Sequence, residues 1–291
     1  MLRSMYAGIS GMRGFQTKLD VVGNNIANVN TAGFKKGRVT FQDMMSQTTR
    51  GAQAPTANRG GTNPAQVGLG SQLGTIDNIH TQGFRQPTDN PLDFSIEGDG
   101  MFVVASNIAY NENNINLEAE DVNVSYTRAG NFYFDENGAV VNPQGLYLIG
   151  YAANADNEEI IEPRTLSTII IPEDAQSFSV TSNGTVNYID ADGTPKIAGQ
   201  LALANFSNPA GLEKAGSNLY RNSPNAGYTG VFAPESEDLA SSVISNSLEM
   251  SNVDLAEEFT EMITAQRGFQ ANTRIITTSD EILQELVNLK R

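Results

Sequence analysis

The sequence of 291 residues has no cysteine, no tryptophan and a single histidine, His80. Without cysteine it has no thiol nucleophile, no disulfide and no thiolate ligand for zinc. A Ser-His-Asp triad would have to be built on His80, and the sequence has no nucleophile-elbow motif. The glycines of residues 68–74 miss the dinucleotide-binding spacing, and the acidic turn at residues 190–193 lacks the calcium-loop pattern. We therefore expect no catalytic residue, no cofactor and no metal ion.

Basic residues are scarce as well. Eighteen Lys and Arg against 33 Asp and Glu give a formal net charge of -15 and a pI near 4.4. Nucleic-acid binding depends on neutralising phosphates with Lys and Arg, so we expect no nucleic-acid partner. The longest apolar runs fall far short of the roughly 20 residues that span a bilayer. The residues after Met1 also lack the apolar core of a secretory signal. We predict no membrane insertion and no cleaved signal peptide.

Proline is absent from both ends of the chain, because all 11 prolines lie within residues 55–234. Apolar residues recur at steps of three and four over residues 2–29, which predicts a long amphipathic helix. The same spacing over residues 255–287 predicts a second, longer helix with Asp254 as its N-cap. Gly268 lies inside this second helix, where glycine costs about 1 kcal/mol relative to alanine. We expect a local loosening there.

The two ends carry charge of opposite sign. Residues 1–40 have a net charge of +5, and residues 235–291 have a net charge of -7. Opposite charges favour contact between the two predicted helices, so we expect them to form a coiled-coil-like pair. Lys35, Lys36 and Arg38 form a basic cluster, which is usually solvated at such a position and has the acidic C-terminal helix as a natural partner.

The chain between the helices is predicted to be β-rich. Short runs of β-branched and aromatic residues alternate with Asn-Gly and Asp-Gly turn signals, which is typical of antiparallel hairpins. Residues 46–75 are rich in Gly, Ala, Thr, Asn and Gln, which predicts an extended linker. The predicted fold class is α+β, with long terminal helices and a mostly antiparallel middle. The expected parts are an N-terminal helical core segment (1–45), the linker, a β-rich region (76–234) with a small polar insertion near 106–123, and a C-terminal helical core segment (235–291).

Two motifs resemble the flagellar rod, hook and hook-associated proteins. The first is NNIANVNTAGFKK at residues 24–36, which is similar to the N-terminal signature of that family. The second comprises SNVDL at residues 251–255 and QRGFQ at residues 266–270, which together resemble the partner helix of the same family. Three further segments resemble the β domain of hook and distal-rod proteins: residues 92–102, 126–132 and 145–150.

The resemblance implies that paired terminal helices form the inner wall of a helical tube, with the β domains outside. The asparagines of the first motif would cap or cross-link the helix end through their amides. Gly33 would permit a backbone reversal before Phe34 anchors the next segment. The implied motif residues are Asn24, Asn25, Ile26, Asn28, Thr31, Gly33 and Phe34, and the implied helix-packing residues are Leu19, Val22, Leu255, Phe259, Met262, Ile263, Gln266 and Phe269.

The resemblance implies a structural subunit without enzymatic activity, and it leaves two roles open. We favour the hook, a curved universal joint that transmits motor torque to the filament, because residues 106–123 resemble an insertion. The alternative is the distal rod, a straight and rigid tube, which the short chain favours. Implied partners are further copies of this chain, the distal rod protein, the hook cap, hook-associated junction proteins and the flagellar type III export apparatus. The implied location is the extracellular hook or basal body of a bacterial flagellum.

A hypothesis from another class is a carboxylate-dependent hydrolase with helical flanks. Asp93, Glu97 and Asp99 lie close enough in sequence to supply a pair of carboxylates. They alternate with Phe94 and Ile96, however, which is the pattern of a half-buried strand and its turn. We favour the structural interpretation of these acids.

Overall fold

The computed structural model describes residues 2–56, 59–108, 115, 122–154, 160, 165–236 and 240–289. The chain divides into two compact units. Unit 1 contains residues 1–28, 36–79 and 253–291, and unit 2 contains residues 29–35 and 80–252. The chain therefore passes from one unit to the other at four points. The predicted insertion near 106–123 lies mostly outside the described residues.

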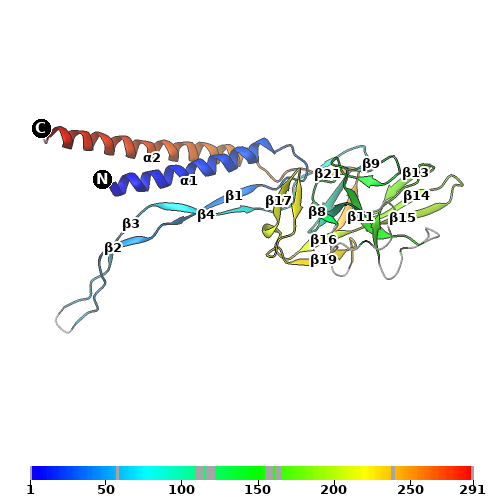
Figure 1. The fold of residues 1–291 in the computed structure, drawn as a ribbon, viewed down its shortest axis with the longest axis horizontal. Coiled ribbons are helices and arrows are strands. Elements are labelled where there is room, and N and C mark those ends of the chain that lie inside the picture. The colour runs from blue at the N-terminus through cyan, green and yellow to red at the C-terminus, as the bar shows by residue number, and fades with distance from the viewer. Residues whose placement is uncertain are drawn as a thin grey trace. The chain divides into compact units, whose positions relative to one another are not determined.

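Unit 1 contains two long helices, α1 (Leu2–Ala27) and α2 (Leu255–Leu289), which confirms the predicted terminal helices. They lie side by side and antiparallel (Figure 1). α2 begins directly after Asp254, whose carboxylate accepts hydrogen bonds from the backbone N–H groups of Ala256 (2.8 Å) and Glu257 (3.4 Å). Asp254 is thus the N-cap, and it satisfies donors that the first turn of a helix leaves unpaired.

Unit 1 also contains a two-stranded antiparallel ribbon. β1 (Gly37–Asp43) pairs with β4 (Ser71–Asn78), and β2 (Ser46–Arg50) pairs with β3 (Ala65–Gly68). Residues 46–75, expected to be an extended linker, therefore contain paired strands. Most residues of the ribbon are exposed on both faces, so its sequence lacks the apolar alternation by which a half-buried strand is recognised.

The ribbon lies against α1 through aromatic and small residues. The rings of Phe15 and Phe41 have centroids 6.2 Å apart. A Cβ atom added to Gly14 would lie 2.9 Å from the Phe41 ring, and one added to Gly70 would fall on the Ser10 side chain. The glycines at these positions bring the ribbon close to the helix.

Unit 2 is built from short strands, and every strand pairing among the described residues is antiparallel, as predicted. The main sheet runs in the order β13-β14-β15-β11-β7-β8-β18-β17, with β9, β10, β12, β16 and β19 attached to it. Two small sheets pair β20 with β6 and β21 with β5. The bounds are β5 (Arg85–Pro87), β6 (Phe94–Glu97), β7 (Met101–Ser106), β8 (Asn123–Thr127), β9 (Tyr133–Phe134), β10 (Val140–Val141), β11 (Tyr147–Ala152), β12 (Leu166–Thr168), β13 (Ser177–Val180), β14 (Thr185–Ile189), β15 (Pro195–Leu201), β16 (Leu203–Phe206), the 3-10 turn Pro209–Gly211, β17 (Glu213–Gly216), β18 (Leu219–Arg221), β19 (Tyr228–Phe232), β20 (Ser242–Ser245) and β21 (Ser247–Glu249).

The predicted C-terminal helical segment, residues 235–291, thus begins with two strands that belong to unit 2. β20 and β21 return the chain to strands that lie early in unit 2, and α2 starts only afterwards. Their serine-rich sequence gives little apolar periodicity, so it did not separate these strands from the helix that follows.

The core of unit 2 is centred on an aromatic cluster. The rings of Phe102 and Phe132 meet edge to face with centroids 5.4 Å apart, and Phe94 lies 5.8 Å from Phe132. All three side chains are at most 1% exposed. Such rings bury a large apolar area, so this cluster contributes strongly to the stability of the unit.

We expect Phe132→Ala to lower the free energy of unfolding of unit 2 by about 3 to 5 kcal/mol, because the lost ring leaves a cavity. Tyr133→Ala is the matched control, since its neighbouring side chain is 52% exposed. The control should change the free energy of unfolding by less than about 0.5 kcal/mol. Urea unfolding of the full chain measures both, and equal effects would contradict the assignment of the core.

Candidate assembly interface

The contact between α1 and α2 is made where small residues let the helices approach. A Cβ atom added to Gly11 would lie 2.9 Å from the Asn272 side chain. One added to Gly268 would lie 2.5 Å from the Phe15 ring. We expected Gly268 to loosen α2. Its lack of a side chain instead leaves room for the Phe15 ring of α1.

Asn25 joins three segments of unit 1 and is only 1% exposed. Its Nδ2 donates to the backbone oxygen of Gly37 (2.9 Å) and to the Glu258 carboxylate (3.2 Å). Its Oδ1 accepts a hydrogen bond from the Gly37 N–H (3.0 Å). One amide thereby ties the end of α1 to the start of β1 and to the first turn of α2. Burial raises the pKa of the Glu258 carboxyl, although the hydrogen bond from Asn25 opposes this shift.

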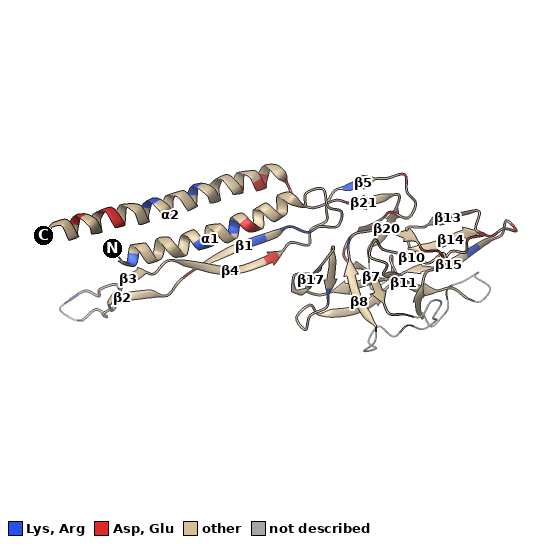
Figure 2. Ribbon diagram, turned by 45° about the horizontal axis from the view of Figure 1, so that its top comes forward, with Lys and Arg blue, Asp and Glu red and all other residues tan. Residues whose placement is uncertain are grey.

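Two ion pairs connect the basic N-terminal part of unit 1 with the acidic helix α2. Lys18 lies 3.2 Å from Glu261, and Lys36 lies 2.9 Å from Glu257. Figure 2 shows the charges along both helices. Each pair is partly exposed and is worth about 0 to 1 kcal/mol, so these pairs contribute little to stability.

Several large apolar side chains of α2 stay out of the contact with α1, although Ile276 lies against Gly8. Of the expected packing residues, Val22 is buried, and Leu19 and Met262 are partly buried. The buried residues of α2 are Glu258, Ala265 and Ser279. The exposed members of the predicted set lie along the other side of α2: Leu255, Phe259, Ile263, Gln266 and Phe269, with the four apolar ones between 36% and 52% exposed.

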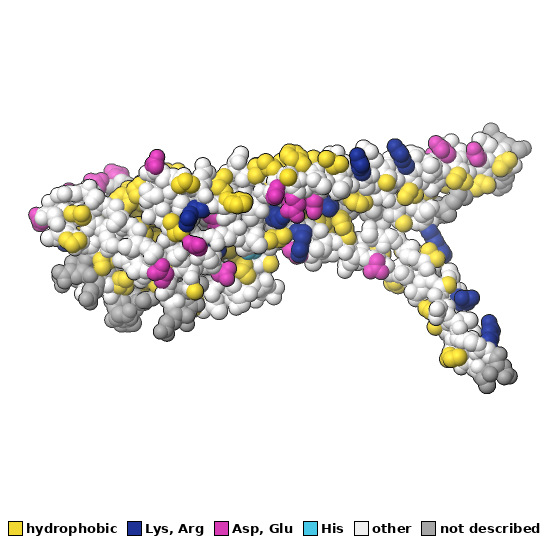
Figure 3. All heavy atoms as spheres, turned by 180° about the vertical axis from the view of Figure 1, so that it is seen from behind, with side chains coloured by type: hydrophobic (Ala, Val, Ile, Leu, Met, Phe, Trp, Pro, Cys, Tyr) yellow, Lys and Arg dark blue, Asp and Glu magenta, His cyan; other side chains and the backbone are white. Residues whose placement is uncertain are grey.

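These five exposed residues, which we call the α2 stripe, recur at steps of four and three and therefore share one helix face. Figure 3 shows hydrophobic side chains gathered over this part of the molecule. A single chain leaves them in water at an unfavourable free energy of about 25 cal/mol per Å². Whether they pack in an assembly stays a prediction.

The N-terminal motif ends α1 through side-chain amides. Asn28 Nδ2 donates to the backbone oxygen of Asn24 (2.9 Å) and to its side-chain oxygen (3.0 Å). Ile26 and Thr31 are partly buried, and the backbone oxygen of Thr31 accepts a hydrogen bond from the Phe34 N–H (3.3 Å). These contacts turn the chain after the helix.

Gly33 lies at a close approach of two backbones within unit 2. Its φ is +70°, and a Cβ atom there would lie 2.5 Å from the backbone nitrogen of Ala129. Its N–H donates to the backbone oxygen of Glu249 (2.8 Å). Only glycine fits this position without strain. The next residue, Phe34, is buried with the Lys214 ammonium 4.9 Å from its ring centroid.

A buried ionic cluster in unit 2, which we call the Glu249 clasp, was missed by the sequence analysis. Glu249 accepts a hydrogen bond from Lys35 Nζ at 2.6 Å and another from Arg128 at 3.1 Å. All three side chains are at most 5% exposed. Lys35, expected to be solvated, is fully buried, and desolvation lowers the pKa of its ammonium although Glu249 opposes the shift. The sequence does not predict the burial of Lys35, because the neighbouring Lys36 is also a lysine in the same motif and is solvent-accessible.

Backbone groups complete the clasp. Lys35 Nζ also donates to the backbone oxygen of Thr81 (2.8 Å), and the Gly83 N–H donates to Glu249 Oε1 (2.9 Å). Arg128 donates to the backbone oxygens of Ile96 (3.3 Å) and Gly98 (2.5 Å). The clasp thus holds together residues at 35, 81–83 and 249, which stand near the points where the chain enters and leaves unit 2.

The described residues offer no support for the hydrolase hypothesis. Asp93 accepts a hydrogen bond from Asn90 (3.1 Å), and Glu97 lies 4.0 Å from Arg85. Burial and nearby cations lower the pKa of His80 to about 4, so its imidazole is neutral at neutral pH. Among the described residues, no group of three or more His, Asp or Glu is arranged to hold a metal ion. None of the helices in the described part of the chain is long and apolar enough to cross a membrane.

Three protein-family models match the chain. They are Flagella basal body rod protein over residues 5–35, Flagellar hook protein FlgE/F/G D1 domain over residues 95–188, and Flagellar basal body rod FlgEFG protein C-terminal over residues 244–289. The flagellar basal-body rod protein FlgG of Bacillus subtilis (strain 168) is 52% identical over 291 residues, and the alignment covers 100% of both chains. The chain belongs to the flagellar rod and hook protein family.

Two other members of the family show how the likeness is distributed. The rod protein FlgG of Agrobacterium fabrum is 36% identical over 286 residues, with 97% of each chain covered. The hook protein FlgE of Borreliella burgdorferi is 31% identical over 456 aligned residues, with 100% of each chain covered. The resemblance predicted from the two terminal motifs is therefore confirmed. The chain is an axial structural protein of the bacterial flagellum.

We expect Glu249→Gln to lower the free energy of unfolding of the full chain by about 3 to 5 kcal/mol, because two buried cations lose the carboxylate that lies between them. Glu213→Gln is the control, since Glu213 is exposed on β17. Urea unfolding measures both variants. A loss below about 0.5 kcal/mol for Glu249→Gln, the range of ordinary surface substitutions, would mean that the clasp is not a stabilising contact.

A second prediction concerns pH. The folded-state pKa of Glu258 lies above its ordinary value of 4.5, so this carboxyl destabilises the helix pair once it ionises. The contribution of Glu258 to the free energy of unfolding is favourable below pH 4.5 and is lost as the pH rises through the folded-state pKa of this carboxyl. Glu258→Gln keeps a hydrogen-bond acceptor for Asn25 and removes the loss of stability that ionisation of the carboxyl causes.

We therefore expect the Glu258→Gln assembly to melt at a higher temperature than the unmodified one at neutral pH, with the difference vanishing at acid pH. Thermal melts followed by far-UV circular dichroism measure this. Glu257→Gln is the matched control, because Glu257 is exposed and pairs with Lys36. It should melt slightly lower at neutral pH. The same upward shift in both variants would contradict a specific effect of burial.

Proposed function

We propose that this chain is the subunit of the distal rod, a straight tube that polymerises from many copies and carries torque through the basal body. This is the alternative of the sequence analysis, and it replaces the hook as the favoured role. The observation that carries it is the full-length likeness to a basal-body rod protein at 52% identity.

Chain length supports the rod over the hook. The rod protein of Bacillus subtilis aligns over 291 residues with complete coverage of both chains. The alignment with the Borreliella hook protein covers both chains but extends over 456 residues, so that hook protein carries segments which this chain lacks. The argument for the hook was the insertion near 106–123, and a short polar segment weighs less than agreement over the whole length.

The α2 stripe supports assembly from copies. Four exposed apolar side chains on one face of a helix are more than a monomer leaves uncovered without a function. A head-to-tail contact between copies that does not close into a ring produces a helical tube. In such a tube the helices of unit 1 form the inner wall.

The remaining parts of the proposal follow from this role. The partners are further copies of the chain, the rod below, the hook above and the flagellar type III export apparatus. The helical segments and the ribbon are the assembly parts, and the β-rich region is the outer domain. The subunit has no catalytic function and needs no cofactor.

Electron microscopy tests the role directly. Cells without this protein should contain basal bodies with a truncated rod and no hook, and the purified full-length chain should form straight tubes. Basal bodies with a complete rod and curved tubes in vitro would return the assignment to the hook. Normal flagella together with a persistent monomer would contradict both.

The α2 stripe gives a sharper prediction. Ile263→Asp places a charge in the buried contact between copies, so we expect polymerisation to be lost. Thr264→Asp adds the same charge at the next position of α2, which is exposed and lies on a different helix face, and it should polymerise as the unmodified chain does. Sedimentation measures the polymerised fraction. Equal polymerisation of the two variants would exclude the stripe from the contact.

A further inference from the structure

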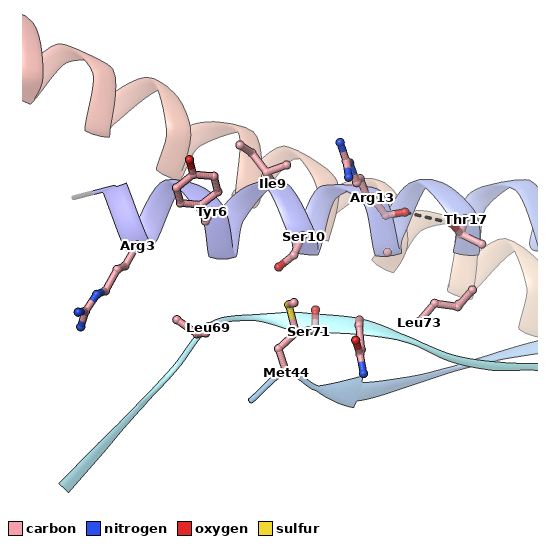
Figure 4. A pocket seen from close by; sticks show the side chains of 12 residues that line it. Arg3, Tyr6, Ile9, Ser10, Arg13, Thr17, Met44, Leu69, Ser71 and Leu73 are labelled. Atoms are coloured by element: carbon pink, nitrogen blue, oxygen red, sulfur yellow. Dashed lines mark hydrogen bonds between the residues drawn. The ribbon is translucent and has the colours of Figure 1, made fainter. Parts of the chain in front are cut away.

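A groove runs between α1 and the ribbon of unit 1 (Figure 4). We call it the α1–ribbon groove. It has a volume of about 570 Å³. Two arginines and several apolar side chains line it, and its described lining contains no acidic residue. The lining includes Arg3, Tyr6 and Arg13 on α1, and Met44, Leu69 and Leu73 on the ribbon.

The groove is open to a partner. Tyr6 is 69% exposed, Leu73 is 40% exposed and Leu69 is 36% exposed. The helix α2 of the same copy lies on another side of α1, where it contacts Gly8 and Gly11 through Ile276 and Asn272. Residues 3, 6, 10, 13 and 17 share the helix face turned away from that contact. The α2 helix of the same copy therefore cannot fill the groove.

The end of α2 is an amphipathic segment that extends beyond the described part of α1. Gly8 lies beside Ile276, so at about 1.5 Å per residue the last two turns of α2 run past the start of α1 at Leu2. Figure 1 shows α2 extending beyond α1 at this end. Ile282, Leu286 and Leu289 are spaced by four and three residues on one face, and they are 48%, 48% and 82% exposed.

The charges of the two surfaces are complementary. Residues 275–289 of α2 carry Asp280, Glu281 and Glu285 and no basic residue. Glu281 and Glu285 are four residues apart and lie along one edge of the apolar face that contains Ile282. The groove offers apolar side chains together with Arg3 and Arg13. An amphipathic helix laid into an apolar groove with opposite charge at its rim is a recurrent mode of recognition.

We propose that the last turns of α2 from one copy of the chain dock in the α1–ribbon groove of another copy. The inference rests on the self-assembly proposed above and names the surface that receives α2. The contact is head-to-tail, because the donor surface and the acceptor surface differ, and it can therefore propagate along a tube.

Disulfide trapping tests the contact, because the chain has no cysteine of its own. Copies with Leu286→Cys are mixed with copies that carry Tyr6→Cys or Leu73→Cys, assembled and oxidised. Each chain then has one thiol, so every heterodimer links two copies. Heterodimers that mass spectrometry identifies by their joined peptides are expected, since a disulfide requires Cα atoms within about 7 Å.

Val287→Cys is the matched control. Val287 is the next residue, is 65% exposed and lies on a different face of α2. Val287→Cys should give much less heterodimer than Leu286→Cys with both groove variants. Tubes that form normally but give no heterodimer with Leu286→Cys would overturn the docking and leave the proposed function intact. A chain that never assembles would overturn both.

Charge reversal gives an independent readout. Glu281→Lys combined with Glu285→Lys should raise the concentration needed for assembly by about tenfold, and Arg3→Glu combined with Arg13→Glu should do the same. All four changes in one chain should restore assembly. Additive losses without restoration would overturn the proposed pairing of the two surfaces.

Discussion

One buried carboxylate, Glu249, holds the segments that enter and leave unit 2. It lies between Lys35 and Arg128, and its cluster also fixes the backbone at residues 81–83. Removing two cations and an anion from water costs several kcal/mol per ion, and only close pairing with complete hydrogen bonding offsets that cost. The clasp therefore specifies one arrangement of these segments.

Unit 1 is held together by a different principle. Its helices meet through glycines, Ile276 and one buried amide, and the four large apolar side chains of the α2 stripe remain exposed. A helix pair of this kind leaves an apolar surface of α2 exposed in the single chain. Unit 2 has its own apolar core, whereas unit 1 leaves large apolar side chains exposed in the single chain.

The sequence was sufficient for the terminal helices, the N-cap at Asp254, the antiparallel β-rich middle and the family. Each depends on local patterns: apolar periodicity, the absence of proline, turn residues and contiguous motifs. The burial of Lys35, the packing role of Gly268 and the pairing of residues 46–75 were not predicted. They depend on which distant residue lies opposite, as Phe15 lies opposite Gly268, and a single sequence does not carry that information.

The face of α2 illustrates the same limit. Periodicity located a helix with an apolar stripe, and the natural interpretation was that the stripe contacts α1. Instead small residues such as Ala265 and Gly268 face α1, and Phe259 and Ile263 point elsewhere.

The measurement that tests the central claim most directly is a helical reconstruction of the assembled tube by electron microscopy. The account predicts that Phe259 and Ile263 are buried against neighbouring copies, and side chains that remain in contact with solvent throughout the tube would contradict it.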